Sequence, residues 1–175
     1  MSVITPVVLW MTGLSGAGKS TIAYALEKKL QNENSFCEVL DGDMLRTGIN
    51  SGLGFSEADR KENIRRTAEI AKILCSNNFI VICSLITPTD DLREIAKTIL
   101  GDKFRLVYIC SSLETCQKRD VKGLYNKALK GEIPNFTGIS APFDVPGKAD
   151  LVIDTQNQPE SQSVEALYTF LRNLS

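Results

Sequence analysis

The sequence predicts a doubly wound α/β domain, in which helices cover both faces of a parallel sheet of about five strands. Apolar runs alternate with helical patterns, and residues 79–83 and 106–110 are continuously apolar. Such runs are typical of strands buried on both faces, as in parallel sheets. Residues 13–20 read GLSGAGKS and follow the apolar run 7–11. These residues match the P-loop pattern that binds phosphate between a strand and a helix, so we expect a single P-loop domain over residues 1–175.

Strands and helices are expected to alternate from one end of the chain to the other. The strands are expected near residues 7–12, 37–41, 79–84, 104–110 and 150–154. The helices are expected near residues 19–31, 56–76, 89–99, 112–119 and 160–173. In such a sheet ligands bind at the carboxyl ends of the strands, so the residues that follow each strand are the candidates for a site.

Two of the helices show an apolar stripe at helical spacing. One stripe comprises Ile22, Ala25, Leu26 and Leu30, and the other comprises Ile64, Ala68, Ala71 and Cys75. Ser56 and Asp59 predict a capping box at the start of the second helix. On that helix Arg60, Asn63 and Thr67 lie within about 60° of one another, since each residue advances by ~100°. They form either a row of donors for an anionic or ribosyl ligand or a solvated face.

Composition narrows the class of protein. With 175 residues, of which 43% are hydrophobic and 23% charged, the chain can form one globular domain. A net charge of -1 disfavours non-specific binding to nucleic acids or membranes, so a small-molecule ligand is expected. Because the chain has no histidine, catalytic triads with histidine and zinc sites with histidine ligands are excluded, and proton transfer must rely on carboxylates. Five isolated cysteines predict reduced thiols, and the first apolar run is too short for a signal peptide or a membrane span, so we expect a cytoplasmic protein.

The phosphate-binding loop predicts a nucleotide site. Its glycines allow the chain to curl around phosphate, and the amides at the start of the following helix favour an anion. Lys19 is expected to reach the β and γ phosphates, and the Ser20 hydroxyl is expected to bind magnesium. The residues expected to bind the nucleotide are Gly13, Leu14, Ser15, Gly16, Ala17, Gly18, Lys19, Ser20 and Thr21.

Two carboxylates follow the second strand, where the sequence reads Leu-Asp-Gly-Asp over residues 40–43. This position lies at the same edge of the sheet as the phosphate-binding loop. One carboxylate, Asp41, can support the metal, and the other, Asp43, can orient or deprotonate an acceptor hydroxyl in phosphoryl transfer. The alternative is an Asx turn that caps a helix from Met44 onward.

Residues 120–148, which we call the lid segment, combine four glycines, three prolines and several lysines. This composition predicts that the segment lies outside the core. It is either a mobile lid that closes over phosphates or a long surface excursion, and loops of this length are usually functional.

Taken together, the motifs of this chain resemble those of the adenylylsulfate kinases, which make 3'-phosphoadenylylsulfate. The resemblance extends over nearly the whole chain. The motifs are GLSGAGKS at 13–20, LDGD at 40–43 with Arg46, LGFS-x-x-DRKENIRR at 53–66, RD-x-KGLY at 119–125, FTGI at 136–139 and LVIDT at 151–155.

The resemblance implies that the γ-phosphoryl group of ATP passes, with Mg²⁺, to the 3'-hydroxyl of adenylylsulfate. It implies catalytic roles for Lys19 and Asp43 and metal ligation at Ser20 and Asp41. It also implies a homodimer. The acceptor nucleotide is expected to contact Asp43, Arg46, Phe55, Arg60, Asn63, Ile86, Thr87, Lys122 and Phe136, with the two phenylalanines sandwiching its base. Arg119 is expected to cover the ATP adenine, Thr155 to contact the same nucleotide, and Lys122 to approach phosphates from the lid segment.

One motif departs from the family pattern. Family members usually carry Phe-Ile-Ser-Pro after the third strand, whereas this chain has Leu85-Ile86-Thr87-Pro88. Since Thr87 replaces that serine, direct in-line transfer is expected and a phosphoserine intermediate is not. The departure leaves two alternatives open: a 3'-hydroxyl kinase for another nucleotide conjugate, such as a cytidine diphosphate-type intermediate, or a non-catalytic nucleotide-binding module.

Overall fold

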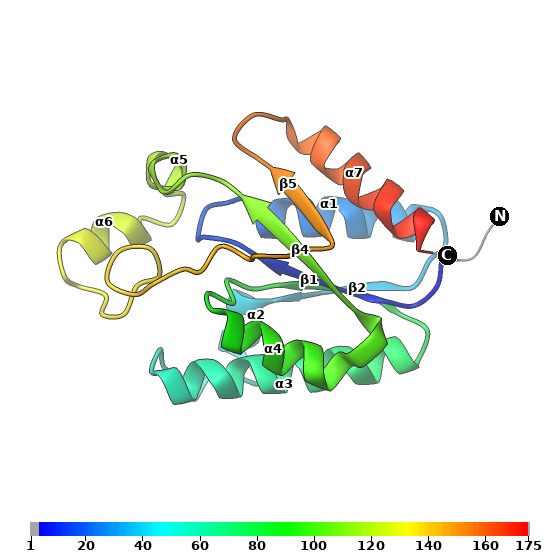
Figure 1. The fold of residues 1–175 in the computed structure, drawn as a ribbon, viewed down its shortest axis with the longest axis horizontal. Coiled ribbons are helices and arrows are strands. Elements are labelled where there is room, and N and C mark those ends of the chain that lie inside the picture. The colour runs from blue at the N-terminus through cyan, green and yellow to red at the C-terminus, as the bar shows by residue number, and fades with distance from the viewer. Residues whose placement is uncertain (1–3, 175) are drawn as a thin grey trace.

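The computed structural model describes residues 4–174 and confirms the predicted parallel sheet. Its strands are β1 (Val8–Thr12), β2 (Cys37–Asp41), β3 (Ile80–Ser84), β4 (Phe104–Cys110) and β5 (Leu151–Asp154), in the order β2-β3-β1-β4-β5. All neighbouring strands pair in parallel. β1 is therefore the central strand, and the phosphate-binding loop leaves the sheet at its middle (Figure 1).

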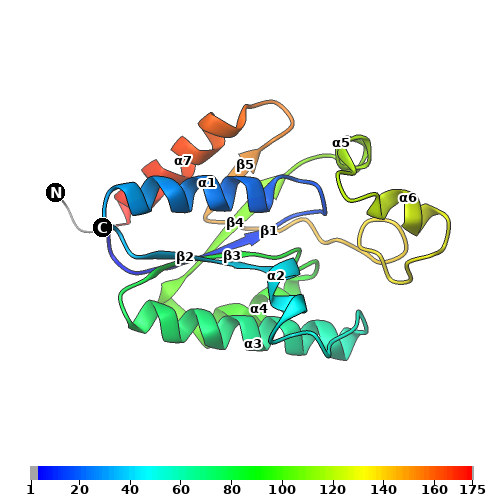
Figure 2. The same cartoon turned by 180° about the vertical axis from the view of Figure 1, so that it is seen from behind.

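Helices cover both faces of the sheet, as predicted. α1 (Lys19–Asn32) and α7 (Glu160–Asn173) lie on one face, and α3 (Glu57–Ser76) and α4 (Asp90–Leu100) lie on the other (Figures 1 and 2). α5 (Leu113–Arg119) follows β4, and a 3-10 turn, η1 (Gly101–Lys103), precedes that strand. Two short helices complete the fold: α2 (Gly42–Thr47), which matches the alternative of a capped helix around Met44, and α6 (Leu124–Leu129), which was not predicted.

The core consists of two apolar layers, one on each face of the sheet. Successive residues of a strand point to opposite faces, so Leu9 packs in the α1 and α7 layer, whereas Trp10 packs in the α3 and α4 layer. The predicted stripes on α1 and α3 face these layers; Ala25 is partly buried and the other members are buried. The five cysteines are free thiols, as expected.

The lid segment corrects one expectation, because part of it belongs to the core. Tyr125 on α6 is only 2% exposed and packs in the α1 and α7 layer, and Ala128 and Thr137 are also buried. The Tyr125 hydroxyl donates to the Ser15 carbonyl at 2.9 Å. An aromatic anchor in a glycine- and proline-rich segment thus fixes the lid segment against the phosphate-binding loop.

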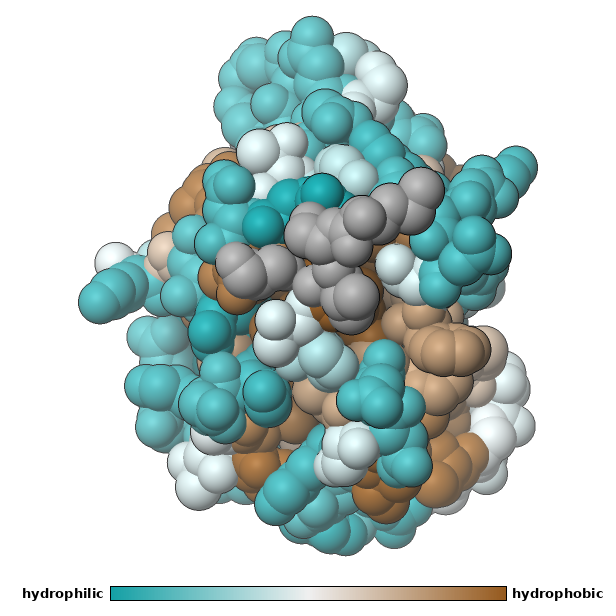
Figure 3. Space-filling model, turned by 90° about the vertical axis from the view of Figure 1, so that its right-hand side faces the viewer, coloured by the Kyte–Doolittle hydropathy of each residue, from teal (hydrophilic) through white to brown (hydrophobic). Residues whose placement is uncertain are grey.

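The end of the molecule that lies opposite the lid segment presents mainly hydrophilic side chains with apolar areas between them (Figure 3). No helix within residues 4–174 is long and apolar enough to cross a membrane. The cavity with polar and cationic side chains lies at the other end of the molecule, where the carboxyl ends of the strands meet the lid segment.

Candidate functional site

A cavity of about 780 Å³ lies at the carboxyl end of the sheet, between the phosphate-binding loop, α3 and the lid segment. Every predicted site residue except Gly13, Leu14 and Ala17 lines it. Those three belong to the phosphate-binding loop, and Leu14 lines a separate apolar hollow beside residues 138–143. The structure thus brings nearly all of the predicted residues together, although they come from seven separate stretches of the chain.

The phosphate-binding loop takes its shape from its glycines. Gly13 has φ +155°, and a Cβ atom there would lie 2.5 Å from the Ile109 carbonyl oxygen, so no larger residue fits. Gly18 has φ +98° and stands at the N-terminal end of α1. Because the first amides of a helix have no partner within the helix, this end of α1 can bind an anion.

Lys19 is enclosed by the loop that it serves. The residue is only 8% exposed, and its ammonium donates to the carbonyls of Gly13 at 2.9 Å and Leu14 at 2.8 Å. Burial lowers the pKa of Lys19 to about 8, because desolvation disfavours the charged form. A triphosphate in the cavity would restore the charge, and the ammonium would then neutralise the developing negative charge at the γ phosphate.

Ser20 and Asp41, the two residues predicted to hold a metal, are in direct contact. The Ser20 hydroxyl donates to Asp41 Oδ2 at 2.5 Å and lies 3.2 Å from Ser84 Oγ. Asp41 Oδ1 accepts from the Asp43 amide at 2.9 Å, so Asp41 caps α2, as the alternative interpretation of this residue predicts. A hydroxyl and one carboxylate oxygen suit Mg²⁺, which keeps several waters and binds substrate phosphates. Ser84 was not predicted, although its place at the end of β3 was a signal.

Asp43 stands on α2 and lines the cavity together with the phosphate-binding loop and Arg46. Its carboxylate forms an ion pair with the Lys122 ammonium of the lid segment. The side chains of Asp43 and Lys122 are 69% and 58% exposed, so this pair contributes at most about 1 kcal/mol. Substrate can therefore replace it at little cost, and Lys122 lies close enough to the phosphate-binding loop to lower the pKa of Lys19.

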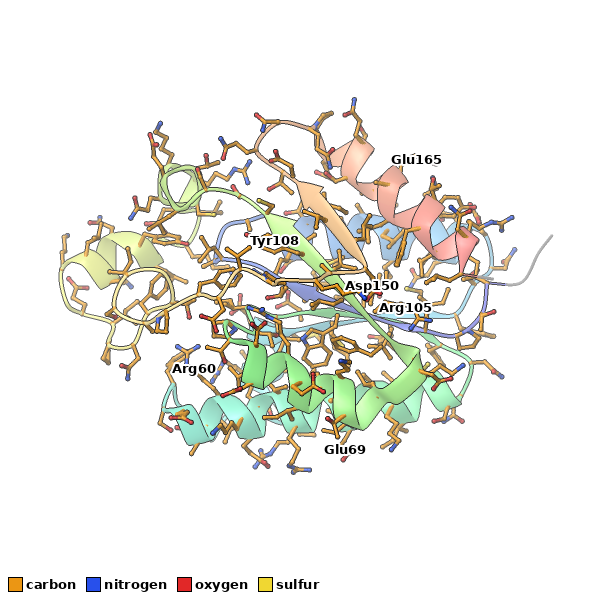
Figure 4. All side chains as sticks on the ribbon, viewed as in Figure 1. Arg60, Glu69, Arg105, Tyr108, Asp150 and Glu165 are labelled. Carbon is orange, nitrogen blue, oxygen red and sulfur yellow. The ribbon has the colours of Figure 1, made fainter. Side chains whose placement is uncertain are left out.

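Arg46 and Arg60 form a cationic wall of the cavity, on the side where the acceptor nucleotide is predicted to bind. Arg46 donates to the carbonyls of Leu53 and Gly54, and its guanidinium carbon lies 4.4 Å from the centre of the Phe55 ring. Arg60, at the lid-facing end of α3, donates to the Asn135 carbonyl at 2.6 Å (Figure 4). Burial lowers the pKa of both guanidinium groups, and the charge of Arg46 lowers the pKa of Arg60 further.

Asn63 and Thr67 lie on the same helix as Arg60, but they are buried, so the solvated-face alternative is wrong for them. Asn63 lines the cavity, whereas the Thr67 hydroxyl donates to the Asn63 carbonyl within the helix. The Ser56 hydroxyl accepts from the Asp59 amide at 3.1 Å, which confirms the cap that starts α3.

The aromatic and nucleotide-facing residues also line the cavity. Phe55 is 51% exposed, and Phe136 is held in an edge-to-face contact with Tyr125 at 5.0 Å between ring centres. Arg119 donates to the Thr155 carbonyl at 2.6 Å, and the Thr155 hydroxyl donates to the Ala17 carbonyl at 2.7 Å. This arrangement fixes Arg119 and Thr155 against the phosphate-binding loop.

The turn after β3, which contains the predicted residue Thr87, is held by three residues that were not predicted: Trp10, Thr12 and Arg93. Thr87 has φ +40°, which is rare for a β-branched residue, and it is 2% exposed. The Trp10 indole donates to the Thr87 hydroxyl at 2.9 Å. The Thr87 carbonyl accepts from Thr12 Oγ1 at 3.1 Å and from Arg93 Nε at 3.2 Å. A hydroxyl buried in this way is badly placed to attack a phosphate.

Comparisons with known proteins agree with this geometry. The family model described as adenylylsulphate kinase matches residues 5–154. An adenylyl-sulfate kinase of Bacteroides thetaiotaomicron is 54% identical over 162 residues, covering 92% of this chain and 81% of the relative. That of Paraburkholderia xenovorans is 47% identical, covering 98% and 96%.

Solved structures give the same result. The Mycobacterium tuberculosis APS kinase, in complex with AMPPNP and APS, has a TM-score of 0.93 and 38% identity, covering 96% of this chain and 98% of that one. A hexameric APS kinase from Thiobacillus denitrificans has a TM-score of 0.72 and 28% identity over 95% of this chain, which spans 29% of that chain. Because the family model matches most of the length of this chain, the chain belongs to the adenylylsulphate kinase family.

Proposed function

We propose that the protein transfers the γ-phosphoryl group of ATP to the 3'-hydroxyl of adenylylsulfate. The observation that carries the proposal is the single cavity in which the phosphate-binding loop, Asp43 and the cationic wall of Arg46 and Arg60 meet. The AMPPNP and APS of the Mycobacterium tuberculosis enzyme are an ATP analogue and the proposed acceptor. Two anionic nucleotides need two cationic subsites, and this cavity offers both.

In the proposed reaction, the 3'-oxygen of the acceptor attacks the γ phosphorus, and the bond from that phosphorus to the β-phosphate oxygen of ATP breaks. Asp43 accepts the proton of the hydroxyl, and ADP leaves. Lys19 and the helix N-terminus of α1 neutralise charge on the transferring group, which is the main catalytic contribution a protein makes to phosphoryl transfer. No protein nucleophile is needed, and the burial of Thr87 supports direct transfer.

The proposal includes Mg²⁺, held by Ser20 and, through its surrounding shell, by Asp41. The ion would neutralise charge on the β and γ phosphates. Its support is the 2.5 Å contact between the Ser20 hydroxyl and Asp41 Oδ2. We also propose a homodimer in the cytoplasm; free thiols at all five cysteines fit a reducing compartment.

A panel of acceptors tests the proposed function. Purified protein is supplied with ATP and Mg²⁺, and ADP release is followed with adenylylsulfate, with cytidine diphosphate conjugates or with no acceptor. Mass spectrometry identifies the phosphorylated product. We expect turnover with adenylylsulfate only. Turnover with a cytidine conjugate alone would favour the other nucleotide-conjugate kinase, and nucleotide binding without turnover on any acceptor would favour the non-catalytic module.

A further inference from the structure

Asn50 is a buried polar residue for which neither the motifs nor the proposed reaction provides a role. It lies in the loop between α2 and α3 and is 0% exposed. Its backbone is fixed at both ends, because its amide donates to the Leu45 carbonyl at 2.9 Å and its carbonyl accepts from the Leu53 amide at 3.0 Å. The side chain therefore projects from a rigid turn.

The Asn50 side chain reaches one residue of the cavity wall. Its Nδ2 donates to Asn63 Oδ1 at 2.9 Å, and both groups are buried. Asn63 Nδ2, by contrast, makes no side-chain hydrogen bond to any of residues 4–174, and it is not among the described buried atoms that lack a partner. The Asn63 NH₂ group is consequently left accessible from the cavity that Asn63 lines, while its oxygen is occupied by Asn50.

The pair could in principle take the opposite orientation. If both amides were turned over, Asn63 would donate to Asn50 and would present its oxygen to the cavity. Either orientation leaves one side-chain atom of Asn50 buried with no partner among the described residues, Oδ1 in the observed pair and Nδ2 in the reversed one, so the two orientations differ in the group that Asn63 presents to the cavity. In the observed orientation that group is the NH₂ of Asn63, which adds a third hydrogen-bonding donor group to Arg46 and Arg60 for an anionic ligand.

We propose that Asn50 is a positioning residue for the acceptor nucleotide. Asn50 donates to Asn63 Oδ1 from a rigid turn and so fixes the orientation of the Asn63 amide. In that orientation the Asn63 NH₂ group can donate hydrogen bonds to oxygen atoms of the bound nucleotide. Asn50 itself does not touch the ligand. The inference rests on the proposed function, since it is the anionic acceptor nucleotide that requires donors here.

The test is Asn50→Asp, measured as KM for adenylylsulfate and, separately, KM for ATP. An ionised carboxylate at position 50 can only accept, so Asn63 must turn its NH₂ toward it and its oxygen toward the cavity. We expect the KM for adenylylsulfate to rise roughly ten-fold, the scale of one hydrogen bond to a charged group, while the KM for ATP stays within about two-fold. Asn50→Ala leaves Asn63 free to turn and is expected to give a smaller rise.

A double-mutant cycle with Asn63→Ala separates positioning from a structural effect. In the Asn63→Ala background, Asn50→Asp is expected to cause no further change in the KM for adenylylsulfate. Asn77→Asp, an exposed amide-to-carboxylate change at the other end of α3, is the matched control. If Asn50→Asp does not fold, Asn50→Ala enters the same cycle in its place.

Three results would overturn the inference: an unchanged KM for adenylylsulfate in both Asn50 variants, an equal rise of KM for both substrates, or the same rise with and without Asn63. An active wild type with any of these results refutes the role of Asn50 alone. A wild type that turns over no adenylylsulfate refutes the proposed function, and the role of Asn50 falls with it.

Discussion

The affinity for ATP is expected to fall as the pH rises through about 8, because Lys19 loses its proton there. The pKa of Lys19 lies about 2.5 units below its ordinary value of 10.5, which corresponds to about 3 kcal/mol for charging this side chain in the buried loop. ATP binds the protonated form and restores the ordinary pKa, so affinity follows the protonated fraction of the free protein. That fraction falls from about three quarters at pH 7.5 to about one tenth at pH 9, which predicts roughly eight-fold weaker binding.

Isothermal titration with MgATP, without acceptor, measures this effect between pH 7.5 and pH 9, where the triphosphate is already ionised. Lys19→Met removes the titrating group and is expected to bind weakly with little dependence on pH over this range. Lys127→Met, an exposed lysine of α6, is the matched control and is expected to keep the full dependence. An affinity for the unmodified protein that does not change between pH 7.5 and pH 9 would refute the reasoning about desolvation.

Three further predictions concern the same site. Asp43→Asn is expected to lower kcat by about 10² to 10⁴ with the affinity for ATP retained, because it removes the proton acceptor. Steady-state kinetics measure this effect, with Asp102→Asn at an exposed position as the control. Full activity of the Asp43→Asn variant would refute the prediction. Gly13→Ala places a methyl group 2.5 Å from a carbonyl oxygen of β4 and is expected to lower Tm by roughly 10 °C, whereas Gly48→Ala, with open space around it, is expected to change Tm little. After incubation with ATP, peptide mass spectrometry is expected to find Thr87 unmodified, and a phosphorylated Thr87 peptide would contradict direct transfer.

The sequence was sufficient for the sheet because β1, β3 and β4 contain compact apolar runs, and each predicted strand precedes a helical pattern. It indicated α2 only as an alternative, through the capping residue Asp41, and it did not indicate α6; each has six residues, too few for a helical period to be visible. α6 was hidden further by the glycines and prolines around it. Its burial depends on Tyr125, whose contact with Ser15 joins residues 110 positions apart and has no local signal.

The candidate site shows the same division. Residues within a contiguous motif, such as Lys19 and Asp43, could be found because the motif itself indicates their chemistry. Residues that act by holding another residue could not be found in this way. Asn50 and Asn63 are 13 positions apart, and Trp10 and Thr87 are 77 positions apart. Each pair depends on which side chains the fold brings together, which is determined by packing rather than by spacing.

The contacts around Thr87 explain how the two halves of the cavity keep their relative positions. The Gly13 amide and the Thr12 hydroxyl both donate to the Ile86 carbonyl, at 3.3 Å and 2.7 Å, so the start of the phosphate-binding loop is joined directly to the turn after β3. Arg93, which is 4% exposed, holds the other side of that turn through the carbonyls of Thr87 and Pro88. In-line transfer requires the attacking oxygen and the γ phosphorus to be aligned within a fraction of an ångström. Hydrogen bonds from β1 and α4 fix this turn against the start of the phosphate-binding loop, as the proposed in-line transfer requires, and they explain why a strained conformation persists at Thr87.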